Sequence, residues 1–244
     1  MQQSHDLTGA TIAFDLDGCL VDTAPDLIGT LNSILADHGH AGLPLAAART
    51  LVGHGARALL SRGFETVGET LDPVRMDQLF GRFLEIYVGR IDRESRPYPG
   101  VVPALEALAA TGARLAVCTN KRTDLSLLLL DSLDLTRRFE VVMGPDRAGA
   151  AKPDPRHLIA AIEAAGGSPE RALMIGDSRA DVGVAVAAGV PVVAVSFGYS
   201  DVPPAELGAD ALIDSFAELP PIARRLLAPR RAAIRPVLPD QADA

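Results

Sequence analysis

The sequence is poor in cysteine, and this shortage excludes two classes of architecture. Cys19 and Cys118 are the only cysteines among 244 residues. Two cysteines are too few for a disulfide framework, and they lack the close spacing of a zinc site. We therefore expect two reduced thiols.

Positive charge is also scarce. The chain has 23 Lys and Arg against 31 Asp and Glu, which gives a net charge of −8 and a pI of about 5.1. A nucleic-acid partner or an anionic membrane surface would require a basic field, and none is indicated here. An acidic small molecule would have to meet a local cation instead.

Long apolar runs are missing as well. No run approaches the length of a membrane span, and the opening "MQQSHDLTG" lacks the basic start and apolar middle of a secretory signal. We therefore expect a soluble cytoplasmic protein without a membrane partner. A monomer and a homodimer are both compatible with the sequence.

What the sequence does contain is an alternation of apolar segments. Hydrophobic residues make up 48% of the chain, enough for one large domain or one domain that carries an insert. Residues 10–16 form a short β-branched run that predicts a buried strand. After residue 97, helical patterns alternate with strand patterns in "ARLAVCTN", "EVVMG", "RALMIGD" and "VPVVAVSF". This βαβ series predicts an α/β fold with a doubly wound, mostly parallel, Rossmann-like sheet.

A purely helical block separates the first strand from the rest. Thr23 is a possible N-cap and Pro25 lies in the following first turn, while no convincing strand occurs between residues 22 and 96. We interpret residues 22–96 as an inserted all-helical cap, and residues 1–21 with 97–226 as the core. The Pro- and Arg-rich tail, residues 227–244, is predicted to be mobile.

Polar residues follow the predicted strands. "AFDLDGCLVD" places Asp15 and Asp17 at the end of the first strand, and two carboxylates this close require a nearby cation. Alone, the pattern D-x-D-G is also compatible with a simple turn. "VCTN" ends the next strand with Thr119 and Asn120, whose hydroxyl and backbone N–H can donate to an oxyanion, although a Thr-Asn turn is an equal alternative.

Two later segments add charge. "AKPDP" places Lys152 before prolines that restrict its backbone, so this side chain can offset the aspartates or be an ordinary surface charge. "MIGDSRAD" gives Asp177 and, one helical turn later, Asp181; helix capping by Asp177 is the alternative. Oxygen ligands without a His or Cys cluster favour Mg²⁺ over Zn²⁺, and magnesium commonly binds phosphate. The sequence therefore predicts a magnesium site for a small phosphorylated substrate.

The ordered set "DLDGCLVDT", helical insertion, "CTNK", "AKPDP" and "GDSRADV" resembles the haloacid dehalogenase superfamily of phosphotransferases over nearly the whole chain. Within it, "VDTAPDL", "LVGHGARALL", "YPGV", "TNK" and "FGYS" resemble the phosphoglycolate phosphatase branch. The resemblance implies a Mg²⁺-dependent phosphomonoester hydrolase that forms an aspartyl-phosphate, with 2-phosphoglycolate as the expected substrate.

The resemblance also implies roles for the acidic residues. Asp15 would be the nucleophile, and Asp17 the general acid and then the general base. Mg²⁺ would be held by Asp15, the backbone carbonyl of Asp17, and Asp177. Asp181 would orient the metal-bound waters without binding the metal itself. Dehalogenases of the superfamily lack an aspartate at the position of Asp17, so halide displacement is not expected.

Phosphoryl oxygens would be bound by Thr119, Asn120 and Lys152, and Lys152 would also hold Asp15 ionised and oriented. Gly18 would permit a tight turn beside the phosphate.

In the cap segment "GHGAR", His54 or Arg57 is expected to meet a substrate carboxylate, although a solvent-facing Arg57 at a helix start is the alternative. The family usually has Thr where this chain has Cys19, and we expect this thiol to be sensitive to oxidation.

Other functions remain open at this point. The same mechanism would serve a phosphatase for sugar phosphates or pyrophosphate, and a β-phosphoglucomutase-like mutase would return the phosphoryl group to the sugar. A binding module without turnover is disfavoured, because the residues for catalysis are all present.

Overall fold

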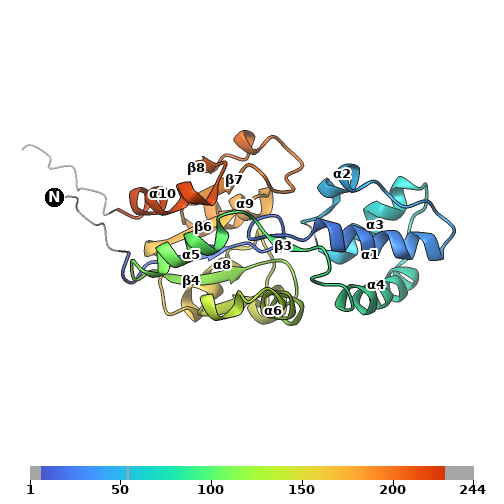
Figure 1. Ribbon diagram of the computed structural model, residues 1–244, viewed down its shortest axis with the longest axis horizontal. Helices are drawn as coiled ribbons and strands as arrows, with labels where there is room; N and C mark the ends of the chain where they lie inside the picture. Colours follow the sequence, from blue (N-terminus) through green and yellow to red (C-terminus); the bar gives the residue numbers. More distant parts are fainter. Residues whose placement is uncertain (1–6, 54, 229–244) are drawn as a thin grey trace, which may run out of the picture.

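The computed structural model of the chain describes residues 7–53 and 55–228, and its centre is a parallel β-sheet (Figure 1). The sheet has six strands in the order β5-β4-β1-β6-β7-β8, and every neighbouring pair is parallel. Because β1 lies in the interior, the chain winds outward from it in both directions. The predicted doubly wound α/β fold is confirmed. The strands are β1 (Thr11–Phe14), β4 (Arg114–Cys118), β5 (Val141–Met143), β6 (Ala172–Gly176), β7 (Val192–Val195) and β8 (Ala211–Ile213).

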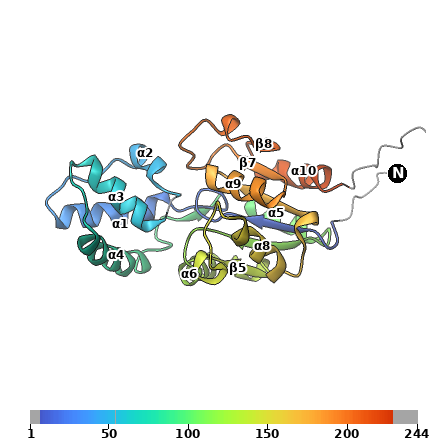
Figure 2. The same ribbon diagram turned by 180° about the vertical axis from the view of Figure 1, so that it is seen from behind.

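The strands alternate their side chains between two helical layers. Ile12 and Phe14 of β1 belong to one core cluster, and Ala13 between them belongs to the other. Helices α5 and α10 contribute to the first cluster, and α8 and α9 to the second (Figures 1 and 2). Every residue of β1 is buried, which explains why the sequence shows an apolar run instead of alternation. The helices around the sheet are α5 (Val101–Ala109), α6 (Thr123–Ser132), α7 (Pro145–Ala148), α8 (Pro155–Ala164), α9 (Arg179–Ala188) and α10 (Leu219–Leu226).

Helices α1 to α4, which lie between residues 24 and 88, stand apart from the sheet (Figure 1). Their apolar faces meet one another, with Leu31, Phe64 and Phe83 all buried at the centre. Thr23 occupies the predicted N-cap of the first of them, but its side chain makes no capping hydrogen bond. These helices are α1 (Ala24–Asp37), α2 (Leu45–Ala48), α3 (Ala56–Thr66) and α4 (Pro73–Val88).

A small antiparallel pair joins the helical block to the sheet. Strand β2 (Val21–Asp22) pairs with β3 (Arg96–Pro97). The prediction that residues 22–96 contain no strand is therefore wrong at both ends of the segment, because two-residue strands are too short to produce a sequence period. The domain limits themselves stay a prediction.

Two expectations concern the ends and surface of the molecule. The prediction of a mobile tail falls on residues that, from 229 onward, lie outside the described part of the chain. Among the residues that are described, no helix combines the length and apolar character needed to cross a bilayer.

Candidate active site

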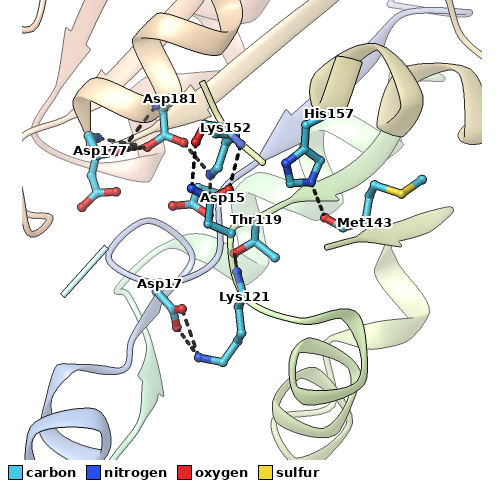
Figure 3. A network of polar contacts seen from close by, with 11 residues as sticks. Asp15, Asp17, Thr119, Lys121, Met143, Lys152, His157, Asp177 and Asp181 are labelled. Carbon is cyan, nitrogen blue, oxygen red and sulfur yellow. Dashed lines mark hydrogen bonds and ion pairs between the residues drawn. The ribbon is translucent and has the colours of Figure 1, made fainter. Parts of the chain in front are cut away.

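The sheet order brings together polar residues that are far apart in the sequence. Strands β4, β1 and β6 are neighbours, and Thr119, Asp15 and Asp177 directly follow their carboxyl ends (Figure 3). Because the strands are parallel, these ends meet at one edge, which is where α/β sheets bind ligands.

Three buried carboxylates form the centre of this edge. Asp15, Asp177 and Asp181 each offer an oxygen, and these oxygens lie within 4.8 Å of one another. A group of oxygen donors without nitrogen or sulfur suits a hard divalent cation such as Mg²⁺. The residues therefore fit the predicted metal. Asp181 lies among the carboxylates that could bind it directly, whereas the expectation was that Asp181 would only orient the metal-bound waters.

The start of α9 fixes Asp181 in this position. Its Oδ2 accepts hydrogen bonds from the backbone N–H of Asp177 at 3.1 Å, the N–H of Ser178 at 3.0 Å and the Ser178 hydroxyl at 2.6 Å. Ser178 is the N-cap of α9. The alternative that Asp177 merely caps this helix is therefore wrong.

Lys152 supplies the positive charge within the cluster. Its Nζ lies 2.8 Å from Asp15 Oδ1 and 2.6 Å from Asp181 Oδ1, and its side chain is 2% exposed. Burial opposes the charge, but the attraction of Asp15 and Asp181 outweighs it and raises the pKa of Lys152. The surface-charge alternative for Lys152 is wrong.

Asn120 holds the loop that carries this lysine. Its side-chain oxygen accepts the backbone N–H of Lys152 at 2.8 Å, and its amide nitrogen donates to the Lys152 carbonyl at 3.1 Å. The Asn120 side chain is thus engaged with the protein, and its backbone N–H is the group left for a substrate oxygen.

One ammonium does not balance three carboxylates. Burial, followed by the repulsion of Asp181 and Asp17, raises the pKa of Asp15 to about 6 despite the attraction of Lys152. Burial together with Asp181 and Asp15 raises the pKa of Asp177 well above its usual value. The cluster therefore favours an added positive charge, either protons or a cation.

Asp17 lies outside this cluster and pairs with a residue to which the sequence analysis gave no role. Lys121 Nζ donates to both carboxylate oxygens of Asp17, at 2.9 and 3.0 Å (Figure 3). Burial opposes this charge, but Asp17 and Tyr87 together raise the pKa of Lys121. A signal for Lys121 exists in the composition: only two of the 23 Lys and Arg are lysines, and both lie in this site.

Gly18 forms the turn between these two groups. Its φ is +84°, and a Cβ there would lie 2.5 Å from Asp177 Oδ2 and 2.8 Å from a ring carbon of Tyr199. A side chain would therefore be strained and would collide with the carboxylate.

Tyr199, from the motif "FGYS", connects the carboxylate cluster to the helical block. Its backbone N–H donates to Asp177 Oδ2 at 2.6 Å, and its hydroxyl donates to Asp22 Oδ1 at 2.6 Å. The same hydroxyl accepts the N–H of Ala24 at 2.9 Å, and Arg49 pairs with Asp22. One residue thus reaches both the sheet edge and the first turn of α1.

A cavity of about 270 Å³ lies between the sheet edge and the helical block. Asp15, Asp17 and Thr119 line it from the sheet, while the helices contribute an apolar wall that includes Leu59 and Phe83. The leaving group of a substrate bound at Asp15 would enter this space.

The two cap residues expected to meet a carboxylate have different outcomes. Arg57 lines the cavity, but its guanidinium pairs with Asp77 at 2.7 Å, lies over the Phe80 ring, and its side chain is 53% exposed. His54 lies outside the described residues.

Cys19 does not have the environment of a reactive thiol. It is fully buried, and burial is the main cause that raises its pKa well above the usual value. Reactive cysteines are accessible and have a lowered pKa. The expectation of oxidation sensitivity at Cys19 is therefore wrong.

Comparison with known proteins places this site in a family. A model of the haloacid dehalogenase-like hydrolases matches residues 12–195, a span that contains all the residues described above except Tyr199. The chain therefore belongs to the haloacid dehalogenase-like hydrolase family.

Relatives define the branch more closely. A phosphoglycolate phosphatase of Caulobacter vibrioides is 54% identical over 227 residues, which cover 93% of this chain and 96% of the relative. One of Agrobacterium fabrum is 44% identical over 220 residues, covering 90% and 94%. The predicted resemblance to phosphoglycolate phosphatases, and with it a phosphatase enzyme, is confirmed.

Solved structures agree with this placement. The crystal structure of a predicted phosphoglycolate phosphatase from Haemophilus somnus 129pt has a TM-score of 0.81 and 31% identity, covering 88% of this chain and 98% of the other. CbbY from Rhodobacter sphaeroides, crystallised in complex with phosphate, has a TM-score of 0.72 and 25% identity over 86% of this chain and 96% of the other.

Proposed function

We propose that this chain is a magnesium-dependent phosphatase that hydrolyses 2-phosphoglycolate through an aspartyl-phosphate on Asp15. The observation that carries the proposal is the position of Asp15, which lies between the carboxylate cluster and a cavity that also contains Asp17. One side of the nucleophile can thus face a cation while the other faces a leaving group. The names of the relatives support the choice of substrate.

In the first step, a carboxylate oxygen of Asp15 attacks phosphorus and the P–O bond to the ester oxygen breaks. Asp17, in its acid form, gives its proton to the departing alkoxide. In the second step, Asp17 takes a proton from water, the resulting hydroxide attacks phosphorus, and the bond to Asp15 breaks. Inorganic phosphate leaves and Asp15 is regenerated.

The remaining residues bind and orient. Thr119 Oγ accepts the backbone N–H of Lys121 at 3.2 Å, which leaves its proton available for a phosphoryl oxygen, as is the backbone N–H of Asn120. Lys152 holds Asp15 against Asp181 and favours its ionised form. Mg²⁺, held by Asp15, Asp177 and the backbone carbonyl of Asp17, would offset the charge of the phosphoryl group when bound.

A second candidate is a phosphatase for other small esters. A mutant of CbbY from Rhodobacter sphaeroides has been crystallised in complex with xylulose-(1,5)-bisphosphate, and that structure has a TM-score of 0.71 to this chain. A panel of 2-phosphoglycolate, glucose phosphates and pyrophosphate, with phosphate release and isomerised sugar measured separately, distinguishes this candidate and a mutase from the first.

The nucleophile is tested by Asp15→Asn, which keeps the shape of the side chain and removes the attacking oxygen. We expect phosphate release from 2-phosphoglycolate to fall by about 10³-fold or more, as for other nucleophile replacements. Acid-quenched wild-type protein should carry a phosphoryl group and the variant none. Undiminished release by the folded variant contradicts the covalent mechanism, and activity that survives a chelator contradicts the metal requirement.

A further inference from the structure

We propose that Lys121 recognises an anionic group on the leaving side of the substrate, so that the site selects phosphate esters of short hydroxy acids. This inference rests on the proposed phosphatase function. It assigns recognition of the leaving group to a buried lysine next to Asp17 instead of to the exposed cap cation Arg57.

Lys121 lies beside the carboxylate expected to meet the ester oxygen of the substrate. If Asp17 protonates the ester oxygen, the leaving-group atoms bonded to that oxygen lie beside the Asp17 carboxylate. Lys121 Nζ contacts both oxygens of that carboxylate, and both residues line the same cavity. In 2-phosphoglycolate the carboxylate carbon is only two bonds from the ester oxygen. The ammonium is therefore the cation that such a carboxylate reaches first.

Among the described residues, three cationic side chains line the cavity. Arg57 pairs with Asp77 and Arg122 with Asp124, and these two side chains are 53% and 51% exposed. The Lys121 side chain is 5% exposed and stands against an apolar wall. An ion pair is stronger where water is excluded, so Lys121 offers a carboxylate the largest gain.

The hydroxyl of Tyr87 has unused hydrogen-bonding capacity. Lys121 Nζ lies 4.8 Å from the centre of the Tyr87 ring, and the buried Tyr87 hydroxyl is close enough to help raise the pKa of Lys121, but no acceptor for the phenol proton is found in the described part of the chain. A buried phenol without an acceptor is costly. A carboxylate beside Lys121 would supply an acceptor oxygen for the phenol proton.

The presence of a lysine, and not an arginine, at position 121 also supports this role. Arginine provides nearly all cations of this chain, and lysine occurs only at positions 121 and 152. A guanidinium is a broad planar fork, whereas an ammonium is a compact charge that fits between a carboxylate and an aromatic ring. Lys152 has such a position between Asp15 and Asp181, and Lys121 has one between Asp17 and Tyr87.

The test compares two substrates with the same ester linkage, 2-phosphoglycolate and 2-hydroxyethyl phosphate, which carries a hydroxyl in place of the carboxylate. The readout is the ratio of their kcat/KM values, because any effect of Lys121 on the position of Asp17 alters both substrates alike. We expect wild-type protein to prefer the acid and Lys121→Met to lose about tenfold or more of that preference. Lys121→Arg should keep part of it.

Two further variants sharpen the result. Tyr87→Phe removes only the phenol oxygen and should reduce the preference by a few-fold. Arg57→Met should leave the ratio unchanged. Loss of the preference in Arg57→Met, with retention in Lys121→Met, assigns recognition to the cap and overturns the proposal.

The outcomes also distinguish a failure of this inference from a failure of the proposed phosphatase function. If wild-type protein hydrolyses neither ester, the proposed function fails. If it hydrolyses both equally, the assigned substrate class fails and the inference with it. If Lys121→Met slows both esters equally and keeps the preference, Lys121 only positions Asp17, and the phosphatase function stands without the inference. Circular dichroism of each variant confirms that it is folded.

Discussion

The sheet edge and the helical block face the same cavity, but they present different kinds of surface. At the sheet edge, Lys152 is 2% exposed and lies between two carboxylates, Asp15 and Asp181. In the helical block, Arg57 is 53% exposed and its partner Asp77 is 69% exposed. The charged groups of the sheet edge are thus held in place before any ligand arrives, while the charged cap pair is solvated.

The difference indicates a division of labour. Groups that must be aligned with phosphorus come from strand ends. The central strand β1 is fixed by hydrogen bonds to β4 on one side and to β6 on the other. The helices contribute shape and exclude water. Between them lie Lys121 and Tyr199, which touch both parts, and we expect substitutions there to have intermediate effects.

The largest expected effect concerns the carboxylate cluster in protein freed of metal by a chelator. In the folded state the pKa of Asp15 is raised to about 6, above its usual value of 3.8, so folding favours the protonated form. The stability that Asp15 contributes is therefore complete at low pH and is lost as the pH rises through 6. The free energy of unfolding should therefore be about 2 kcal/mol higher at pH 4 than at pH 7.5 from this group. Urea unfolding across this range measures it.

The matched control for this experiment is Asp15→Asn, which cannot titrate. Subtracting its pH profile from that of the wild type removes the contributions of groups that do not interact with Asp15, including His157, whose pKa burial lowers, and leaves the joint contribution of Asp15 and Asp177. A difference profile that is flat, or that rises with pH, contradicts the prediction.

An intermediate effect is expected for Tyr199→Phe, at the junction of the two parts. The variant removes the hydroxyl that links Asp22 to Ala24 but keeps the backbone N–H on Asp177. Loss of a buried, doubly bonded hydroxyl should lower the free energy of unfolding by about 1–2 kcal/mol. Tyr98→Phe is the comparison, because the Tyr98 hydroxyl lies at the edge of the same network, with a 3.4 Å contact to a carbonyl and an interaction with Tyr199, and its removal should cost less. Equal losses in the two variants would show that Tyr199 is not a special link.

The smallest effect is expected for Arg57→Met in the helical block. Both members of the Arg57–Asp77 pair are largely exposed, so its removal should change the free energy of unfolding by less than about 1 kcal/mol, even with the contact to Phe80 included. Comparison with Asp77→Asn and the double variant isolates the pair. A loss of several kcal/mol would mean that the cap is held as rigidly as the sheet edge.

Prediction from the sequence succeeded where a residue's position follows from a strand end. Asp15, Thr119 and Asp177 could be placed together because parallel strands end at one edge, and Lys152 could be added because the charges required it. Contacts that depend on the three-dimensional path of loops could not be predicted. Tyr199 meets Asp22 across 177 positions, and no periodicity connects them.

The environment of a side chain could not be predicted from the sequence either. Cys19 follows the first motif directly, and its neighbours along the chain do not reveal that it is fully enclosed. Lys121 could be noticed as the last letter of "TNK" and as one of two lysines, but its role could not be predicted, because that role depends on Asp17, 104 positions away. Such pairings depend on how distant segments pack against each other, and the pattern of residues along the sequence does not show this.

The pairing of β2 with β3 means that the chain enters and leaves the helical block at one place. Insertions, deletions or a different set of helices between these two strands would leave the register of β4, β1 and β6 unaltered. The reactive groups, and Lys121 with them, are therefore shielded from changes in the helices that wall the rest of the cavity. In evolutionary terms, a lineage can alter the size and shape of the leaving group it accepts by remodelling these helices while the chemistry is inherited intact.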